Sequence, residues 1–189
     1  MKFTDAQALL DKYVNGETLK RHCLTVAVAL EYWAREYGEA DPETWRCVGL
    51  LHDIDFELYP KEHCVKAKEI LEAEKANFPG LTDSMIHAIL SHGWKLCNDV
   101  EPVSQMEKTL YTVDELTGLI YACALMRPSK SVMDMEVKSV LKKFKTPAFA
   151  AGCNRDVISE GATLMGMDLN RVIEKTILAM RTEAAALGV

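Results

Sequence analysis

Hydrophobic residues recur along this chain at alternating steps of four and three, which is the repeat of an α-helix. The clearest such stripe predicts a long helix over residues 17–37 with one buried face. Its members are Leu19, Cys23, Val26, Leu30, Trp33 and Tyr37. No segment keeps the alternation of period two that is typical of a half-buried β-strand. The pattern therefore predicts an all-α fold.

Capping and helix-breaking residues divide the rest of the chain into further helices. Thr4 and Gln7 have the spacing of a capping box and predict a short first helix that ends at Asn15-Gly16. Ser131 predicts the cap of a later helix. We expect the other helices over residues 42–51, 61–76, 82–92 and 104–126, and a last helix that starts at Asp168 and frays at residues 184–186.

Length and composition are those of one globular domain. The chain has 189 residues, of which 49% are hydrophobic and 26% are charged, and it is long enough to bury its own core. The net charge of −6 argues against a general nucleic-acid partner, because affinity for a phosphate backbone comes from an excess of Lys and Arg. A small phosphorylated ligand remains compatible with an acidic protein if a metal supplies the positive charge.

Neither a signal peptide nor a membrane span is expected from the hydropathy of the chain. The six cysteines are scattered, without a CxxC pair, which is typical of reduced thiols in a reducing compartment. The expected location is the cytoplasm, with no membrane partner.

Four residues that could hold a metal lie on or beside apolar helix faces. His22 belongs to the buried side of the helix over residues 17–37. His52 and Asp53 end an apolar helix, and Asp114 falls at a core-facing position of a later one. A carboxylate in such a position is costly unless it is paired, hydrogen-bonded or bound to a metal.

Each of these signals is weak alone. An inward-pointing histidine is more often a hydrogen-bonded core residue than a ligand, and a His-Asp dipeptide also occurs by chance. The order His22…His52-Asp53…Asp114 over three helices is far more specific. It predicts one shared metal site.

The order of these residues, with His52 and Asp53 in the segment LLHDID and Asp114 in VDELTGLI, resembles the signature of the HD-domain superfamily of phosphohydrolases. The chain is particularly similar to small HD proteins related to the HDIG group, although Asp55 stands where those carry glycine. The resemblance implies a single all-α domain over residues 1–189, with an HD core over about 18–128 and the helices of 129–189 packed on it. It implies hydrolysis of a phosphate ester or anhydride, often in a nucleotide, but it does not name the substrate.

The residue types fit such chemistry. Two imidazoles and two carboxylates suit a divalent ion such as Mn, Fe, Co, Ni or Mg. Such a metal can activate a water and polarise a phosphoryl group. Asp53 would lie between metal and water, so we expect it to be the catalytic general base.

Further histidines raise the question of a second metal ion. His63 aligns with the inward face of the next helix, and His92 ends another helix. His87 is about half a turn out of phase with His92, so at most one of these two should share a site. We treat His63 and His92 as candidate ligands of a second ion, with a histidine that binds no metal as an equal alternative at each position.

Two basic residues follow the helix that carries Asp114. Arg127 and Lys130 are candidates for binding the substrate phosphate. The lysines of residues 142–145 more simply form a solvated helix face.

The sequence thus predicts a metal-dependent phosphohydrolase of a small phosphorylated molecule, a nucleotide or a related metabolite. One alternative is an HD-type di-iron oxygenase, which needs the complete histidine set. The other is a nucleotide-binding HD module without catalysis. The helices after Pro128 could complete the pocket, form a homo-oligomer interface or pack on the core.

Overall fold

The computed structural model describes residues 1–189 and contains ten helices and no strand. The predicted all-α fold is therefore confirmed. In chain order the helices are α1 (Phe3–Tyr13), α2 (Glu17–Tyr37), α3 (Pro42–Leu51), α4 (Val65–Glu74), α5 (Asp83–Ser91), α6 (Gln105–Leu125), α7 (Val137–Phe144), α8 (Arg155–Leu164), α9 (Leu169–Thr182) and α10 (Ala184–Leu187).

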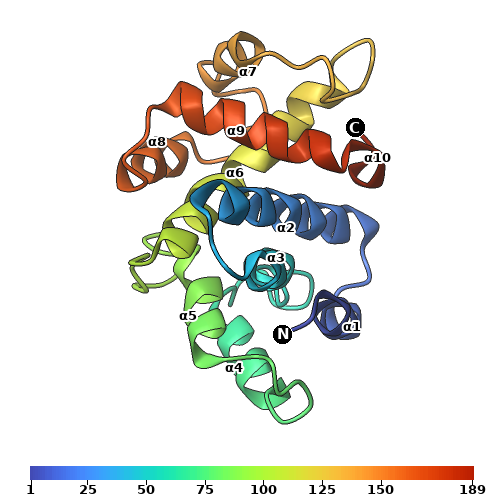
Figure 1. The fold of residues 1–189 in the computed structure, drawn as a ribbon, viewed down its shortest axis with the longest axis vertical. Helices are drawn as coiled ribbons and strands as arrows, with labels where there is room; N and C mark the ends of the chain where they lie inside the picture. Colours follow the sequence, from blue (N-terminus) through green and yellow to red (C-terminus); the bar gives the residue numbers. More distant parts are fainter.

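The two longest helices, α2 and α6, lie between two groups of shorter helices (Figure 1). Helices α1, α3, α4 and α5 lie at one end of the view, and α7 to α10 lie at the other. Buried side chains from both groups belong to one hydrophobic cluster of 49 residues. The chain after Pro128 thus shares its core with the rest of the molecule.

The α2–α3 pair sets the geometry of the later site. Helix α2 ends at Gly38, whose φ of 74° is the left-handed conformation that glycine adopts without strain. Asp41 then caps α3 by accepting a hydrogen bond from the Thr44 N–H. A Cβ atom on Gly49 would lie 2.8 Å from the Ala27 Cα atom. The glycine therefore lets α3 approach the backbone of α2 closely, one turn before His52.

Helix α6 is anchored at its start by a capping box. The Ser104 hydroxyl accepts from the Glu107 N–H, and the Glu107 carboxylate accepts from the Ser104 N–H. This cap fixes the beginning of the helix that carries Asp114.

None of the helices combines the length and the hydropathy that a membrane span requires.

Three local predictions at helix ends are wrong. Thr4 lies inside α1, which starts at Phe3 without a side-chain cap. The Ser131 hydroxyl accepts from the Met133 N–H in a turn, and the next helix starts only at Val137. Residues 184–187 form α10 instead of fraying, because Ala184 and Leu187 are buried.

The helix expected over residues 61–76 also starts late, at Val65. Cys64 precedes it with a φ of 67°, and residues 61–64 form turns. His63 therefore belongs to a turn and not to the helix on which it was predicted.

Candidate metal centre

Three of the predicted ligands meet where α2, α3 and α6 come together. His22 projects from α2, His52 follows the last residue of α3, and Asp114 projects from α6. The Nε2 atoms of His22 and His52 lie 3.2 Å apart, and Asp114 Oδ1 lies 3.0 Å from the first and 3.3 Å from the second. We call His22, His52 and Asp114 the first subsite.

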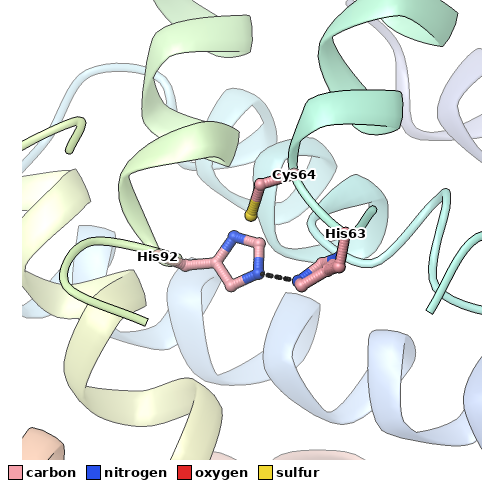
Figure 2. A group of neighbouring side chains, drawn as sticks. All are labelled: His63, Cys64 and His92. Carbon is pink, nitrogen blue, oxygen red and sulfur yellow. Dashed lines mark hydrogen bonds between the residues drawn. The ribbon is translucent and has the colours of Figure 1, made fainter. Parts of the chain in front are cut away.

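Two further histidines meet on the other side of Asp53. The Nε2 atoms of His63 and His92 lie 2.9 Å apart, and Figure 2 shows their rings pointing toward one another from the turn before α4 and the end of α5. We call His63 and His92 the second subsite. The structure thus brings together both histidines that were proposed for a second ion.

Asp53 lies between the two subsites. Its Oδ2 atom is 3.6 Å from His22 Nε2 and 3.4 Å from His52 Nε2. Its Oδ1 atom is 3.4 Å from His63 Nε2 and 3.6 Å from His92 Nε2. One carboxylate therefore faces both subsites, with a different oxygen toward each.

The histidine rings are oriented by acceptors at their other nitrogen. His52 Nδ1 donates to the Gly49 carbonyl at 2.8 Å, and His92 Nδ1 donates to the Ile89 carbonyl. His63 Nδ1 is held 2.8 Å from a carboxylate oxygen of Asp55. With Nδ1 turned toward its acceptor in this way, the Nε2 atom of each ring faces the cluster, where it can bind a cation once it has lost its proton.

Asp55 is a supporting residue that the sequence analysis did not assign to the site. It is fully buried, and its second oxygen accepts a hydrogen bond from the Ala67 N–H at 2.8 Å. The carboxylate thus ties the turn that holds His63 to the first turns of α4. In the sequence the residue reads as part of an acidic, solvated loop, so no local signal marks it.

Electrostatics within the cluster are strongly coupled. Burial opposes the charge of Asp53 and Asp114, but the adjacent imidazoles of His52 and His22 lower the pKa of both carboxyls well below the usual range. Burial lowers the pKa of His52, yet the two carboxylates outweigh it and raise that pKa well above the usual range. The negative carboxylates and the positive form of His52 thus stabilise one another.

The donor set fits a divalent cation. Imidazole nitrogens and carboxylate oxygens converge at separations of 2.9–3.6 Å, and such mixed nitrogen and oxygen donors suit Mn, Fe, Co, Ni or Mg. The groups that could hold a metal are His22, His52 and Asp114 on one side and His63, Cys64 and His92 on the other. A bound cation would take the place of the protons that these nitrogen and oxygen atoms otherwise share.

A cavity of about 470 Å³ opens beside the cluster. Its wall includes His22, Asp53, His63, His92 and Asp114, together with residues of the loop after α3, the loop after α5 and the turn before α8. Those further residues are Phe56, Pro60, Gly93, Leu96, Cys97, Gly152 and Cys153, with Glu115 and Gly118 from α6.

Glu115 also lines this cavity. Its carboxylate accepts from the Asn154 N–H at 2.8 Å, which links α6 to the start of α8. Burial and the neighbouring charge of Asp114 raise the pKa of Glu115 to about 7. The sequence analysis did not single this residue out.

The proposed phosphate-binding residues lie elsewhere. Arg127 and Lys130 do not line the cavity, because Asp114 and the end of α6 are separated by three helical turns. The Arg127 guanidinium is paired with Asp134 at 2.7 Å, and Lys130 is exposed. Their assignment to substrate binding therefore has no support in the structure.

Arg21 lies nearer to the cluster of histidines and aspartates than Arg127 and Lys130 do. A second cavity of about 180 Å³ shares His22 and Gly118 with the first, and Arg21 is the one Lys or Arg among the residues that line either cavity. Its guanidinium donates to the Tyr121 hydroxyl at 3.1 Å. The sequence offered no signal for it, because Arg21 reads as an ordinary polar residue on an exposed helix face.

His87, as expected, does not share the site with His92. Its Nδ1 atom lies 2.8 Å from a carboxylate oxygen of Glu107.

All six cysteines are free, and Cys64 and Cys97 lie together beside the second subsite. Their separation in the sequence gave no sign of this contact.

Comparison with known protein families finds a match to the HD domain over residues 19–115. The matched segment covers just over half of the chain. It includes His22, His52 and Asp114 of the first subsite, together with Asp53. The chain therefore belongs to the HD-domain family, whose members are generally metal-dependent hydrolases. The comparisons with curated proteins and with solved structures found no match.

Proposed function

We propose that this HD-domain protein is a metal-dependent phosphohydrolase that cleaves a phosphate ester or anhydride of a small molecule, a nucleotide or a related metabolite. The observation that carries the proposal is the position of Asp53. Its two carboxylate oxygens face different groups of histidines, His22 and His52 on one side and His63 and His92 on the other. This arrangement supports a site for two ions that share one carboxylate.

The residues of each subsite have distinct parts in this proposal. His22, His52 and Asp114 would hold one ion, and His63 and His92 the other, with Asp53 common to both. A bound divalent metal supplies Lewis-acid polarisation of the phosphoryl group and lowers the pKa of a water. Asp53 lines the cavity and is the proposed acceptor of the proton that the attacking water loses.

The cavities favour a small substrate. About 470 Å³ lies within the range of small-molecule sites, which is roughly 300–1,000 Å³. Arg21 in the adjoining cavity would meet a further anionic or hydroxyl-bearing part of the same molecule. The net charge of −6 disfavours a polyanionic nucleic acid.

A phosphate-release assay tests the proposal. The full-length protein, supplied with Mn²⁺, Co²⁺ or Ni²⁺ in turn, is given a panel of nucleotides and sugar phosphates. We expect release of phosphate or of a nucleoside monophosphate by the wild type, loss of release in Asp53→Asn, and wild-type release in Asp99→Asn, which changes an exposed residue. Tight nucleotide binding without turnover under every metal would instead favour a binding module.

A di-iron oxygenase is a second candidate, because the four histidines and two aspartates of both subsites are all in place. Iron content and oxygen consumption separate the two reactions. Two irons per chain, with oxygen uptake on organophosphonates or polyols and no phosphate release from the panel, would support the oxygenase and contradict the hydrolase.

A further inference from the structure

Two cysteine thiols are held almost within bonding distance beside the second subsite. Cys64 Sγ and Cys97 Sγ lie 3.0 Å apart, although the residues are 33 positions apart in sequence. A disulfide bond measures about 2.05 Å, so a closure of about 1 Å would join them. This is the hydrogen bond that the structure shows between two cysteine sulfurs.

The surrounding backbone creates this contact. Cys64 has a φ of 67°, a left-handed conformation that is uncommon for a residue with a side chain. A Cβ atom on Gly93 would lie 2.4 Å from each of the two sulfurs. Glycine at position 93 therefore leaves the space in which the thiols meet.

Cys97 lies on a short loop whose shape is fixed by its own backbone. The Cys97 N–H donates to the Gly93 carbonyl at 2.9 Å, and the Lys95 N–H donates to the Asn98 carbonyl at 2.9 Å. The Asn98 side chain fastens the loop to the end of α5 by donating to the Leu90 carbonyl. The pairing of the thiols is thus set by two anchored segments.

The two thiols differ in access. Cys97 is exposed and lines the large cavity, whereas Cys64 is buried at 2% exposure. An oxidant from solution therefore reaches Cys97 first, and Cys64 is placed behind it as the thiol that completes the bond. This is the arrangement of an attacking and a resolving cysteine.

We propose that Cys64 and Cys97 are a reversible thiol-modification site that takes a low-molecular-weight disulfide. In the first step the Cys97 thiolate attacks a sulfur of the small disulfide, forming a mixed disulfide and releasing one small thiolate. The Cys64 thiolate then attacks the Cys97 sulfur, which forms the internal disulfide and releases the second small thiolate. The two protein thiols are oxidised, the small disulfide is reduced to two thiols, and the protons of Cys64 and Cys97 pass to them.

The bond would link the segments that carry the second subsite. Cys64 directly follows His63, and Cys97 lies on the loop that follows His92. Figure 2 shows the Cys64 sulfur next to the facing rings of His63 and His92. Oxidation would therefore fasten the two histidine-bearing segments to one another, and reduction would release them.

Thiol counting on the full-length protein tests the proposal. Metal-free protein is treated with oxidised glutathione, alkylated in denaturant so that buried thiols also react, digested and analysed by mass spectrometry. We expect wild type to lose two of its six alkylatable thiols and to yield one cross-linked pair of peptides containing Cys64 and Cys97. The linkage should also raise Tm by roughly 5 °C or more, and dithiothreitol should reverse both changes.

Single substitutions give different results for the two thiols. Cys64→Ser should stop at glutathione-modified Cys97, because the resolving thiol is gone. Cys97→Ser should leave Cys64 unmodified and Tm unchanged by the oxidant. Cys123→Ser, a buried cysteine away from the pair, should behave as wild type.

Six thiols that stay alkylatable in the wild type, or a cross-link through Cys153 in place of Cys64, would overturn the proposal. None of these readouts depends on phosphohydrolase activity. A failed phosphate-release assay would therefore leave the disulfide result standing, and the reverse also holds.

Discussion

The two subsites are built from different kinds of structure. The first takes its ligands from α2, α6 and the end of α3, where helical backbone and buried apolar faces fix each position. In the second, His63 lies in a turn and is oriented by Asp55, and His92 ends α5 beside the loop that carries Cys97. A rigid helical frame and a locally braced loop region thus meet at the shared carboxylate of Asp53.

This difference determines how strongly the position of each ligand depends on the residues around it. Displacing a ligand of the first subsite requires moving a helix that is packed into the main core. Displacing His63 requires only the loss of one buried carboxylate contact or of the packing between two short segments. The second subsite should therefore be the more sensitive to its supporting residues.

Removing a ligand of the first subsite should have the largest effect. Asp114→Asn replaces a carboxylate by a neutral amide between His22 and His52, which weakens cation binding and should abolish hydrolysis. Metal content by elemental analysis and phosphate release both report the change. Glu101→Gln, at an exposed position of the loop before α6, is the matched control. Full metal content and turnover in Asp114→Asn would remove this residue from the site.

Removing the support of His63 should have a smaller effect, confined to the second subsite. In Asp55→Asn the amide can accept from only one of its two donors, His63 Nδ1 or the Ala67 N–H, and turns its own NH₂ toward the other. We expect roughly 10–100-fold weaker binding of the second ion, with the first ion retained. Titration with Mn²⁺ or Co²⁺ measures both affinities, and equal weakening of both would contradict the separate roles of the subsites.

Disturbing the helical frame should act on stability as well as on the first subsite. Gly49→Ala introduces a Cβ that meets the backbone of Ala27, so α2 and α3 must move apart. Overpacking of this kind typically costs about 1–3 kcal/mol of unfolding free energy. Urea denaturation measures the loss, and Gly152→Ala, where a Cβ meets nothing within 4 Å, is the control. Equal stabilities for the two variants would show that the close approach of α2 and α3 is unimportant.

The cap of α6 should give the smallest effect and a defined pH dependence. Burial opposes the charge of Glu107, but hydrogen bonds from the Ser104 and Val103 N–H groups lower its pKa. A lowered carboxyl pKa adds stability above the unfolded value of about 4.3, and this stability is lost as the pH falls through the folded value. Glu107→Gln should therefore cost about 1 kcal/mol near pH 7.

The gap between wild type and Glu107→Gln should then shrink on acidification below about pH 5. Urea denaturation of both proteins at pH 7 and pH 4 checks this. A gap that stays constant over the range would mean that the carboxylate charge does not contribute to the cap.

The contrast between the subsites also explains what the sequence could predict. The first subsite follows from periodicity, because His22 and Asp114 occupy core-facing helical positions where a polar residue is conspicuous. His63 and His92 could be suggested but not placed, since turns carry no repeating pattern. Asp55 looks like a solvated acidic residue until the fold buries it.

Helix ends also differ in how far the sequence could predict them. The starts of α3, α5 and α6 could be predicted, because their caps use local side-chain chemistry. The bounds of α2 could be predicted because Gly16 and Gly38 flank its hydrophobic stripe. The start of α7 and the helix α10 could not be predicted, because tertiary contacts decide where they form. Arg127 was proposed from its nearness in sequence to Asp114, but a helix carries such a residue away from the site at about 1.5 Å per position.

Elemental analysis of wild type beside Asp53→Asn tests the central claim most directly. Asp53 faces both subsites, so its loss should affect both ions. After incubation with Mn²⁺ or Co²⁺ and removal of the excess, the wild type and the Asp99→Asn control should each hold roughly two ions per chain. Asp53→Asn should lose most of this content. Equal metal content in all three proteins would contradict a metal centre built around Asp53.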